Sequence, residues 1–441
     1  MMAIWWSTGP VPLGITSLLP MLVLPMAGIG DTAKATTPYA SPLVFLFLGG
    51  FLMGAAIQRW GLHQRLAHAV VKTAGTGPKT LVLGFMAATA FLSMWISNTA
   101  AVILMLPVAV SVIGAMGLDD DTDQPVMMFA PCLLLGLAYS ANIGGVGTLI
   151  GSPPNALLAG FMRQHGTDIS FAAWSAVAMP FAGIFVMIAW LVLTTLVFRI
   201  PFRNPGAITG TALIARLKPD RPVSCAERRV ALVFATAVAL WITRPLLNTF
   251  DVLAGLTDPA IAIGCAIVLF LVPSGGESGG RRLMTWRDAQ GVPWEILILL
   301  GGGLSLATAV DESGLAAWLA SNLSPAAAIS EMFFLLAVAG MVVSITELAS
   351  NTATVAAFLP VMTAVAEDAG HSVISVSTAI AMAASCAFML PAATPPNAIV
   401  LSTGHLTVLQ MVRAGLLLNV ISVLLIVIAA PLVPALIDGA H

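Results

Sequence analysis

Charged side chains are scarce in this chain, and their scarcity indicates the class of protein. Only 9% of its 441 residues are charged and 59% are hydrophobic, with a mean hydropathy of +0.98. A soluble protein of this length needs more charge on its surface. Several apolar runs approach the roughly 20 residues that cross a bilayer, among them residues 181–198 and 414–437. The composition therefore predicts an all-α polytopic membrane protein embedded in a lipid bilayer.

Patterns typical of catalysis and metal binding are also missing. The four cysteines form no CxxC pair, and the six histidines show no metal-ligand spacing. Neither a nucleophile–base pair nor a glycine-rich phosphate loop is present. We therefore expect neither an enzyme nor a nucleic-acid partner. The first apolar run lacks a basic leader region and a small-residue cleavage site, so it is interpreted as a membrane segment and not as a signal peptide.

The positions of the basic residues predict the topology. Two apolar segments, near residues 80–116 and 326–363, are each interrupted by polar residues. If both enter and leave on one side, 15 of the 18 Lys and Arg residues share a side, and only Lys34, Arg163 and Arg244 lie opposite. The positive-inside rule makes the basic side cytoplasmic. We therefore expect two re-entrant helical hairpins, a cytoplasmic N-terminus and an external C-terminus in a multi-pass protein of the inner (plasma) membrane.

Nine full crossings accompany these hairpins. They are expected at residues 11–28, 41–58, 126–162, 171–199, 230–248, 255–273, 293–310, 376–402 and 414–437.

The two halves of the chain are related by an internal repeat. A shift of 253 positions places the Ser-Asn-Thr motif of residues 97–99 on that of residues 350–352. A shift of 242 positions places the Pro-Pro-Asn motif of residues 153–155 on that of residues 395–397. Five crossings separate the starts of the two copies, so the copies are inverted in the membrane. Inverted repeats are typical of secondary transporters.

Each motif has a physical reason to lie at a binding site. Ser, Asn and Thr favour helix N-caps, so the second arm of each hairpin should begin at its motif and direct a positive helix end into a cavity. The paired prolines break a helix, so residues 126–162 and 376–402 should each form a discontinuous helix. The carbonyl groups freed by each break suit a small cation, and the hydroxyl groups of Ser152 and Thr394 can face a substrate.

Cationic side chains are absent from both repeats. No Lys or Arg occurs in residues 80–162 or 288–412. An anionic substrate would therefore depend on helix N-termini, hydroxyl and amide donors, and co-bound cations. Ser93 and Thr346, four residues before each Ser-Asn-Thr motif, are candidate cation ligands, the alternative being hydroxyls bonded back to their own helix. Glu347 has either a proton-carrying or a structural role.

At these motifs the chain resembles the divalent anion:sodium symporter family, the INDY-type di- and tricarboxylate carriers. The resemblance extends from Ala3 to the C-terminus and includes Trp60-Gly61-Leu62 and the ALWITRP segment of residues 239–245. It implies a homodimer in which a transport domain moves against a scaffold like an elevator. It also implies two further upstream helices, which this sequence, opening at Met1, does not contain.

The resemblance also implies a set of site residues. One sodium site would use Ser93, Ser97, Asn98 and Gly151. The second would use Thr346, Ala349, Ser350, Asn351 and Ala393. Substrate carboxylates would contact Ser97, Asn98, Thr99, Ser152, Ser350, Asn351, Thr352, Thr394 and Pro395. The expected activity is sodium-coupled import of C4-dicarboxylates (succinate, malate and fumarate), with Na+ as the co-transported ion. The alternatives are a sodium-independent or proton-coupled anion exchanger and a sodium-coupled citrate or sulfate carrier.

The resulting division of the chain has five parts. Residues 1–78 hold N-terminal scaffold helices and an interfacial helix, 79–165 the first transport-domain repeat, 166–310 a cytoplasmic linker and further scaffold helices, 311–405 the second transport-domain repeat, and 406–441 a C-terminal helix.

Overall fold

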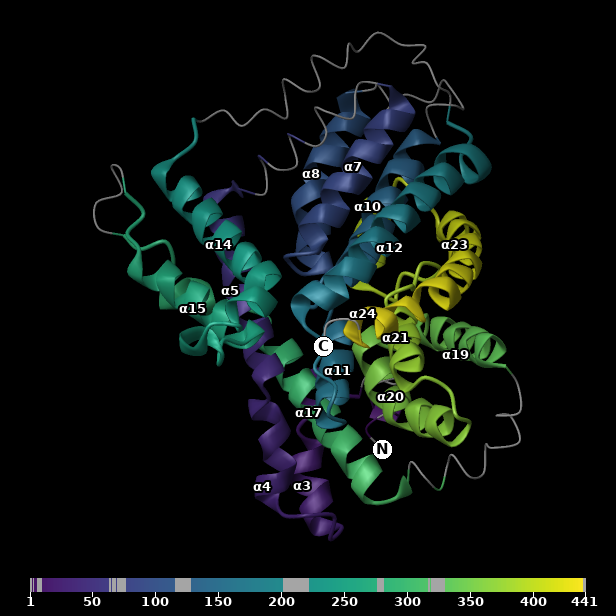
Figure 1. Cartoon of the computed structure of the whole chain (residues 1–441). Coiled ribbons are helices and arrows are strands. Elements are labelled where there is room, and N and C mark those ends of the chain that lie inside the picture. Colours follow the sequence, from purple (N-terminus) through teal and green to yellow (C-terminus); the bar gives the residue numbers. More distant parts are fainter. Residues whose placement is uncertain are drawn as a thin grey trace.

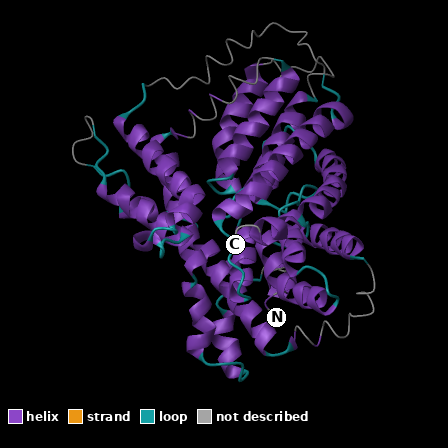
Figure 2. Ribbon diagram, viewed as in Figure 1, coloured by secondary structure: helices purple, strands orange, loops and turns teal. Residues whose placement is uncertain are grey.

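Helices account for nearly all of the regular structure. The computed structural model describes residues 2, 4–5, 10–62, 65, 69, 77–115, 128–200, 222–275, 281–315, 318 and 330–438. Within these ranges the extended backbone is limited to an isolated bridge between Pro273 and Arg282 (Figure 2). The all-α prediction is confirmed.

The helices of the two halves follow one another as listed. The first half contains α2 (Leu13–Thr16), α3 (Leu19–Met26), α4 (Thr32–Thr36), η1 (Thr37–Ala40), α5 (Pro42–Trp60), α7 (Pro78–Ser93), α8 (Asn98–Ala115), α10 (Phe129–Val146), α11 (Pro153–Gln164), α12 (Phe171–Leu191) and η2 (Val192–Val197). The second contains α14 (Cys225–Leu247), η3 (Asp251–Leu253), α15 (Asp258–Leu271), α16 (Trp286–Ala289), α17 (Trp294–Glu312), α19 (Glu331–Thr346), α20 (Asn351–Asp368), α21 (Val373–Ala384), α22 (Pro395–Leu401), α23 (Val408–Ala429) and α24 (Leu432–Asp438).

The helix boundaries reproduce the internal repeat. Helix α7 begins at Pro78, and α19 begins 253 positions later at Glu331. The same offset relates the first residues of α8 and α20, Asn98 and Asn351. Each pair forms a hairpin, and in each the second arm begins at the asparagine of the Ser-Asn-Thr motif. The predicted hairpins are therefore confirmed.

Both predicted discontinuous helices are also present. Helix α10 ends at Val146, and its continuation α11 begins at Pro153; α21 ends at Ala384, and α22 begins at Pro395. Proline lies in the first turn of each continuation, where its missing N–H group costs no helical hydrogen bond.

Two expected crossings are interrupted. Residues 11–28 form α2 and α3 because Pro20, in the first turn of α3, cannot donate a helical hydrogen bond to α2. The run 414–437 divides into α23 and α24 next to Pro431. Helix α23 also begins earlier than expected, at Val408, because Thr407 and Gln410 form a capping box.

By length and composition, five helical stretches of the described residues are able to cross a membrane. They are Thr32–Trp60, Phe129–Val146, Phe171–Val197, Cys225–Leu247 and Val408–Ala435. The shorter apolar helices include both arms of each hairpin, as expected for segments that enter a bilayer without crossing it.

The helices pack in two groups (Figure 1). Helix α5 packs against α14 and α15, while α17 packs against η1, α2 and α3. In the larger group α10 contacts α7, α8, α12 and α22, and α19, α20, α21 and α23 contact one another. Helix α12 lies in the expected scaffold segment 166–310 but packs against α7 and α10. The groups meet where α17 contacts α11 and α20.

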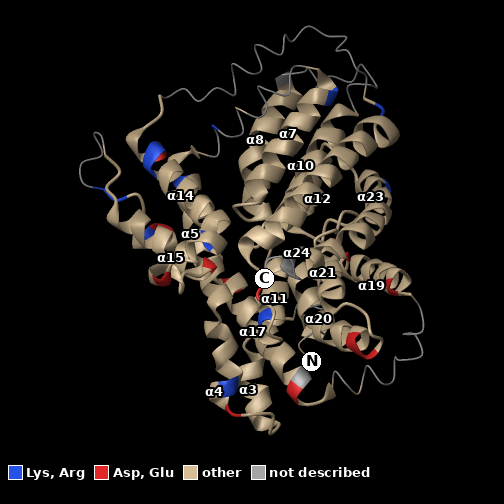
Figure 3. Cartoon of the chain, in the orientation of Figure 1, with Lys and Arg blue, Asp and Glu red and all other residues tan. Residues whose placement is uncertain are grey.

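Ion pairs hold two of the three cations expected on the external side (Figure 3). Lys34 Nζ lies 2.7 Å from Glu312 Oε2, and an Arg244 guanidinium nitrogen lies 3.3 Å from Asp258 Oδ1. The expected interfacial helix, residues 61–75, and the linker, residues 199–229, lie largely outside the described residues.

Candidate functional site

One cavity of about 560 Å³ gathers all four motifs. This volume lies within the usual range for small-molecule sites. The nine residues expected to contact the substrate all line it: Ser97, Asn98, Thr99, Ser152, Ser350, Asn351, Thr352, Thr394 and Pro395. Three further residues expected at the sodium sites, Gly151, Ala349 and Ala393, line it as well. Segments about 250 residues apart in the chain therefore form one site.

Four helices begin at this cavity. Their first residues are Asn98 of α8, Pro153 of α11, Asn351 of α20 and Pro395 of α22, and all four line it. The Ser97 hydroxyl caps α8 by accepting a hydrogen bond from Ala100 N at 3.3 Å. Helix N-termini carry a partial positive charge, so the cavity favours anions although no Lys or Arg is among its described lining residues.

Oxygen atoms converge beside the first hairpin tip. Ser93 Oγ lies 2.7 Å from both Asn98 Oδ1 and the Ala141 carbonyl oxygen. A single hydroxyl hydrogen cannot be donated fully to both acceptors, so the three oxygens share one hydrogen. A Cβ atom at Gly151 would lie 2.6 Å from the Gly145 carbonyl oxygen and 3.0 Å from that of Ser93. A small cation would satisfy this surplus of acceptors.

The second hairpin tip has the same arrangement. Thr346 Oγ1 lies 2.7 Å from Asn351 Oδ1 and 2.9 Å from the Ala384 carbonyl oxygen. Both Ser93 and Thr346 thus reach a neighbouring helix, as a cation ligand must. The described residues hold no group of three His, Cys, Asp or Glu side chains that could bind a metal ion, so neutral oxygens supply both candidate sites.

The asparagines of the Pro-Pro-Asn motifs stabilise the helix breaks. Asn155 Nδ2 donates to the carbonyl oxygens of Gly145, at 2.9 Å, and Thr148, at 2.8 Å. Asn397 Nδ2 donates to the Leu390 carbonyl oxygen at 3.0 Å. Both asparagines are fully buried. These amides occupy carbonyl groups that the breaks would otherwise leave unpaired.

Glu347 stabilises the second break in addition. Its Oε1 accepts hydrogen bonds from Phe388 N at 2.7 Å, Met389 N at 2.9 Å and Asn419 Nδ2 at 2.7 Å, and its Oε2 accepts from Leu390 N at 3.0 Å. The side chain is buried. Four donors fit a permanently ionised carboxylate, so this geometry favours the structural alternative over a proton carrier.

The opposite wall of the cavity comes from the first group of helices. Leu13 of α2, Phe51 of α5, and Glu295, Ile296 and Leu299 of α17 line it. Glu295 Oε1 accepts a hydrogen bond from Gly14 N at 3.1 Å. The sequence analysis missed Glu295 because no local motif indicates that α2 and α17 meet at the cavity.

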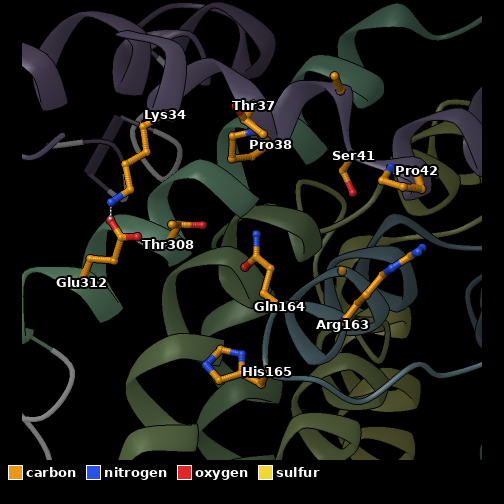
Figure 4. A pocket seen from close by; sticks show the side chains of 12 residues that line it. Lys34, Thr37, Pro38, Ser41, Pro42, Arg163, Gln164, His165, Thr308 and Glu312 are labelled. Carbon is orange, nitrogen blue, oxygen red and sulfur yellow. Dashed lines mark ion pairs between the residues drawn. The ribbon is translucent and has the colours of Figure 1, made fainter. Parts of the chain in front are cut away.

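A second cavity, of about 660 Å³, lies at the boundary between the groups (Figure 4). The ion pair of Lys34 and Glu312 forms one wall, and Arg163, Gln164 and His165 follow the end of α11. None of the expected substrate or sodium residues is among its described lining residues. It is therefore separate from the site formed by the motifs.

The family described as "Sodium:sulfate symporter transmembrane region" matches residues 1–436. This chain belongs to that family. The symporter is 38% identical over 443 aligned residues to the sodium-dependent dicarboxylate transporter SdcS of Staphylococcus aureus strains USA300 and NCTC 8325 / PS 47. The alignment covers 99% of this chain and 85% of the relative.

A solved structure shares the fold. The Alcanivorax borkumensis YdaH transporter, whose crystal structure was described as having an unusual topology, matches 93% of this symporter with a TM-score of 0.59. The match covers 88% of that chain at 14% identity. Membership of the family confirms the predicted sodium-coupled, multi-pass membrane transporter and excludes an enzyme. The roles of individual site residues remain predictions.

Proposed function

We propose that this symporter imports C4-dicarboxylates such as succinate, malate and fumarate together with sodium ions. The observation that carries the proposal is the pairing of two equivalent half-sites, one around Ser97–Thr99 and one around Ser350–Thr352, in a single cavity. Each half-site offers one helix N-terminus with hydroxyl and amide donors, which suits one carboxylate. Two half-sites suit a dicarboxylate, the substrate class that SdcS carries in its name.

Sodium binding follows from the two oxygen clusters. We assign the first ion to Ser93, Ser97, Asn98 and Gly151, and the second to Thr346, Ala349, Ser350, Asn351 and Ala393. A dianion in this cavity meets no cationic side chain among the described lining residues, so nearby sodium ions would offset much of its desolvation cost.

The movement that we propose is a displacement of the larger helix group against the smaller one. The scaffold would consist of α2–α5, α14, α15 and α17. The transport domain would carry both hairpins and both broken helices, with α12 added because it packs against α7 and α10. We place the chain in the inner membrane with its N-terminus in the cytoplasm and its C-terminus outside, on the distribution of basic residues.

We also propose a homodimer, on the family resemblance. Scaffold helices α14 and α15 expose large apolar side chains, including Leu232, Ile242 and Ile267, which a second copy or lipid would cover. Native mass spectrometry in detergent would show a single-chain mass if this expectation is wrong.

The direct test is uptake of radiolabelled succinate into proteoliposomes. An inward sodium gradient should drive uptake, and replacing sodium by potassium should abolish it. The Asn98→Ala and Asn351→Ala variants should each lose uptake because each removes an oxygen shared by a sodium cluster and the cavity. The Ser111→Ala variant is the control, because Ser111 Oγ bonds only back to Pro107 in its own helix and lies away from the cavity.

The alternatives give different results in the same vesicles. Equal uptake with and without sodium would indicate an exchanger or a proton-coupled carrier. Sodium-driven uptake of citrate or sulfate without succinate uptake would overturn the substrate class while leaving sodium coupling in place.

A further inference from the structure

The two repeats touch through a side chain that no motif contains. Asn142 is fully buried in α10 of the first repeat. Its Nδ2 donates to Thr394 Oγ1 at 3.1 Å, across 252 positions of sequence. Thr394 is the N-cap of α22 in the second repeat, and both residues line the substrate cavity. An amide of one repeat therefore fixes a cavity hydroxyl of the other.

The repeat assigns Asn142 a counterpart. The Ala141 and Ala384 carbonyl oxygens are the equivalent acceptors of Ser93 and Thr346, so the residues that follow them, Asn142 and Ser385, occupy equivalent positions. Ser385 Oγ lies 3.4 Å from Ser152 Oγ, just as Asn142 approaches Thr394. Each broken helix thus reaches the N-cap hydroxyl at the opposite break.

The counterparts differ in what else they reach. Asn142 Oδ1 lies 3.4 Å from Asn98 Nδ2, so its amide connects the first sodium cluster to Thr394. The Ser385 hydroxyl has its other described contact with the Ala381 carbonyl oxygen of its own helix, at 3.4 Å. An amide carries a donor and an acceptor on separate atoms, which a single hydroxyl does not.

The direction of these hydrogen bonds has a consequence for the substrate. A sodium ion bound to Asn98 Oδ1 would orient that amide and direct its Nδ2 toward Asn142 Oδ1. Because Asn142 donates to Thr394 Oγ1, the hydroxyl hydrogen of Thr394 is left to donate to a carboxylate. Hydrogen bonds in such a chain polarise one another.

We propose that Asn142 is a positioning residue that couples occupancy of the first sodium site to the affinity of the opposite half-site for a substrate carboxylate. This inference rests on the proposed sodium and dicarboxylate sites. It assigns the two sodium ions unequal roles: the first reaches across to the other repeat through Asn142, whereas the second acts within its own half-site.

The test measures succinate affinity by isothermal titration calorimetry at low and saturating sodium, on purified protein in detergent. In the wild type, sodium should tighten succinate binding. In Asn142→Ser, which installs the residue of the equivalent position, this enhancement should fall by at least ~5-fold, in the range of allosteric coupling energies. In Ser140→Ala it should stay as in the wild type, because Ser140 Oγ bonds only to Leu137 of its own helix.

The outcomes separate the coupling from the proposed function. A wild type whose succinate affinity ignores sodium overturns both. A wild-type sodium enhancement that persists in Asn142→Ser overturns the coupling alone, even if the maximal transport rate falls. If Asn142→Ser does not elute as folded protein, Asn142→Thr, which has nearly the volume of asparagine, replaces it. A larger loss of enhancement in Ser385→Ala than in Asn142→Ser would also refute the unequal roles.

Discussion

Replacing Glu347 by glutamine should destabilise the second helix break without abolishing sodium dependence. The carboxylate accepts hydrogen bonds from three backbone N–H groups and from Asn419 Nδ2. A glutamine amide keeps one acceptor oxygen, best placed where Oε1 accepts three donors. Its NH2 group then faces Leu390 N, where Oε2 now accepts at 3.0 Å.

The cost follows from these contacts. Leaving one buried N–H unpaired costs about 1–3 kcal/mol, and changing three bonds from a charged to a neutral acceptor costs about 1 kcal/mol each. The neutral amide is easier to bury than a carboxylate, which offsets part of this sum. We expect a net destabilisation of about 3 kcal/mol for Glu347→Gln and a larger one for Glu347→Ala, which leaves all four donors unpaired.

The assay combines thermal unfolding in detergent with succinate uptake at several pH values. The control is Glu367→Gln, an exposed carboxylate at the end of α20, which should change stability by no more than about 0.5 kcal/mol. A Glu347→Gln protein with wild-type thermal stability and a lost pH dependence of uptake would refute the structural role and favour the proton carrier.

Three further changes test the sodium clusters and the breaks. Ser93→Ala and Thr346→Ala each remove one cluster oxygen, so each should raise the half-saturating sodium concentration for uptake by about 10-fold, roughly the loss of one net hydrogen-bond-sized interaction; unchanged sodium curves would contradict these sites. Gly145→Ala should abolish uptake because its Cβ would lie 2.5 Å from the shared asparagine oxygen, whereas Gly183→Ala, with no atom within 4 Å, should retain it. Asn155→Ala should lower stability by about 2–4 kcal/mol, since it unpairs buried carbonyl groups; a melting temperature equal to the wild type would show that the break holds without this amide.

Local patterns in the sequence were enough for the hairpins and the breaks. Capping residues, prolines and a constant offset act over a few positions and carry over directly to helix boundaries, as at Asn98 and Asn351. The offset also reveals which elements are equivalent. Equivalent elements of an inverted repeat meet about a common axis, so the gathering of all four motifs in one cavity could be predicted as well.

Tertiary neighbours could not be predicted in this way. Asn142 lies in an apolar run without any local motif, and its role appears only when α10 is placed against the break before Thr394. Glu295 reaches the cavity only because α2 packs against α17. The break between α2 and α3 was missed because Pro20 also fits the first turn of a helix, so the run reads equally well as one crossing.

The uncharged lining of the substrate cavity has an electrical consequence. Its one ionisable residue among the described lining, Glu295, belongs to the proposed scaffold. Glu347 would travel with the transport domain in both directions, so its charge would cancel over a full cycle. The net current per turnover would therefore equal the number of sodium ions minus the charge of the substrate. Each uncompensated charge gains about 2.3 kcal/mol per 100 mV of membrane potential, so the voltage dependence of uptake would count the ions that accompany each dicarboxylate.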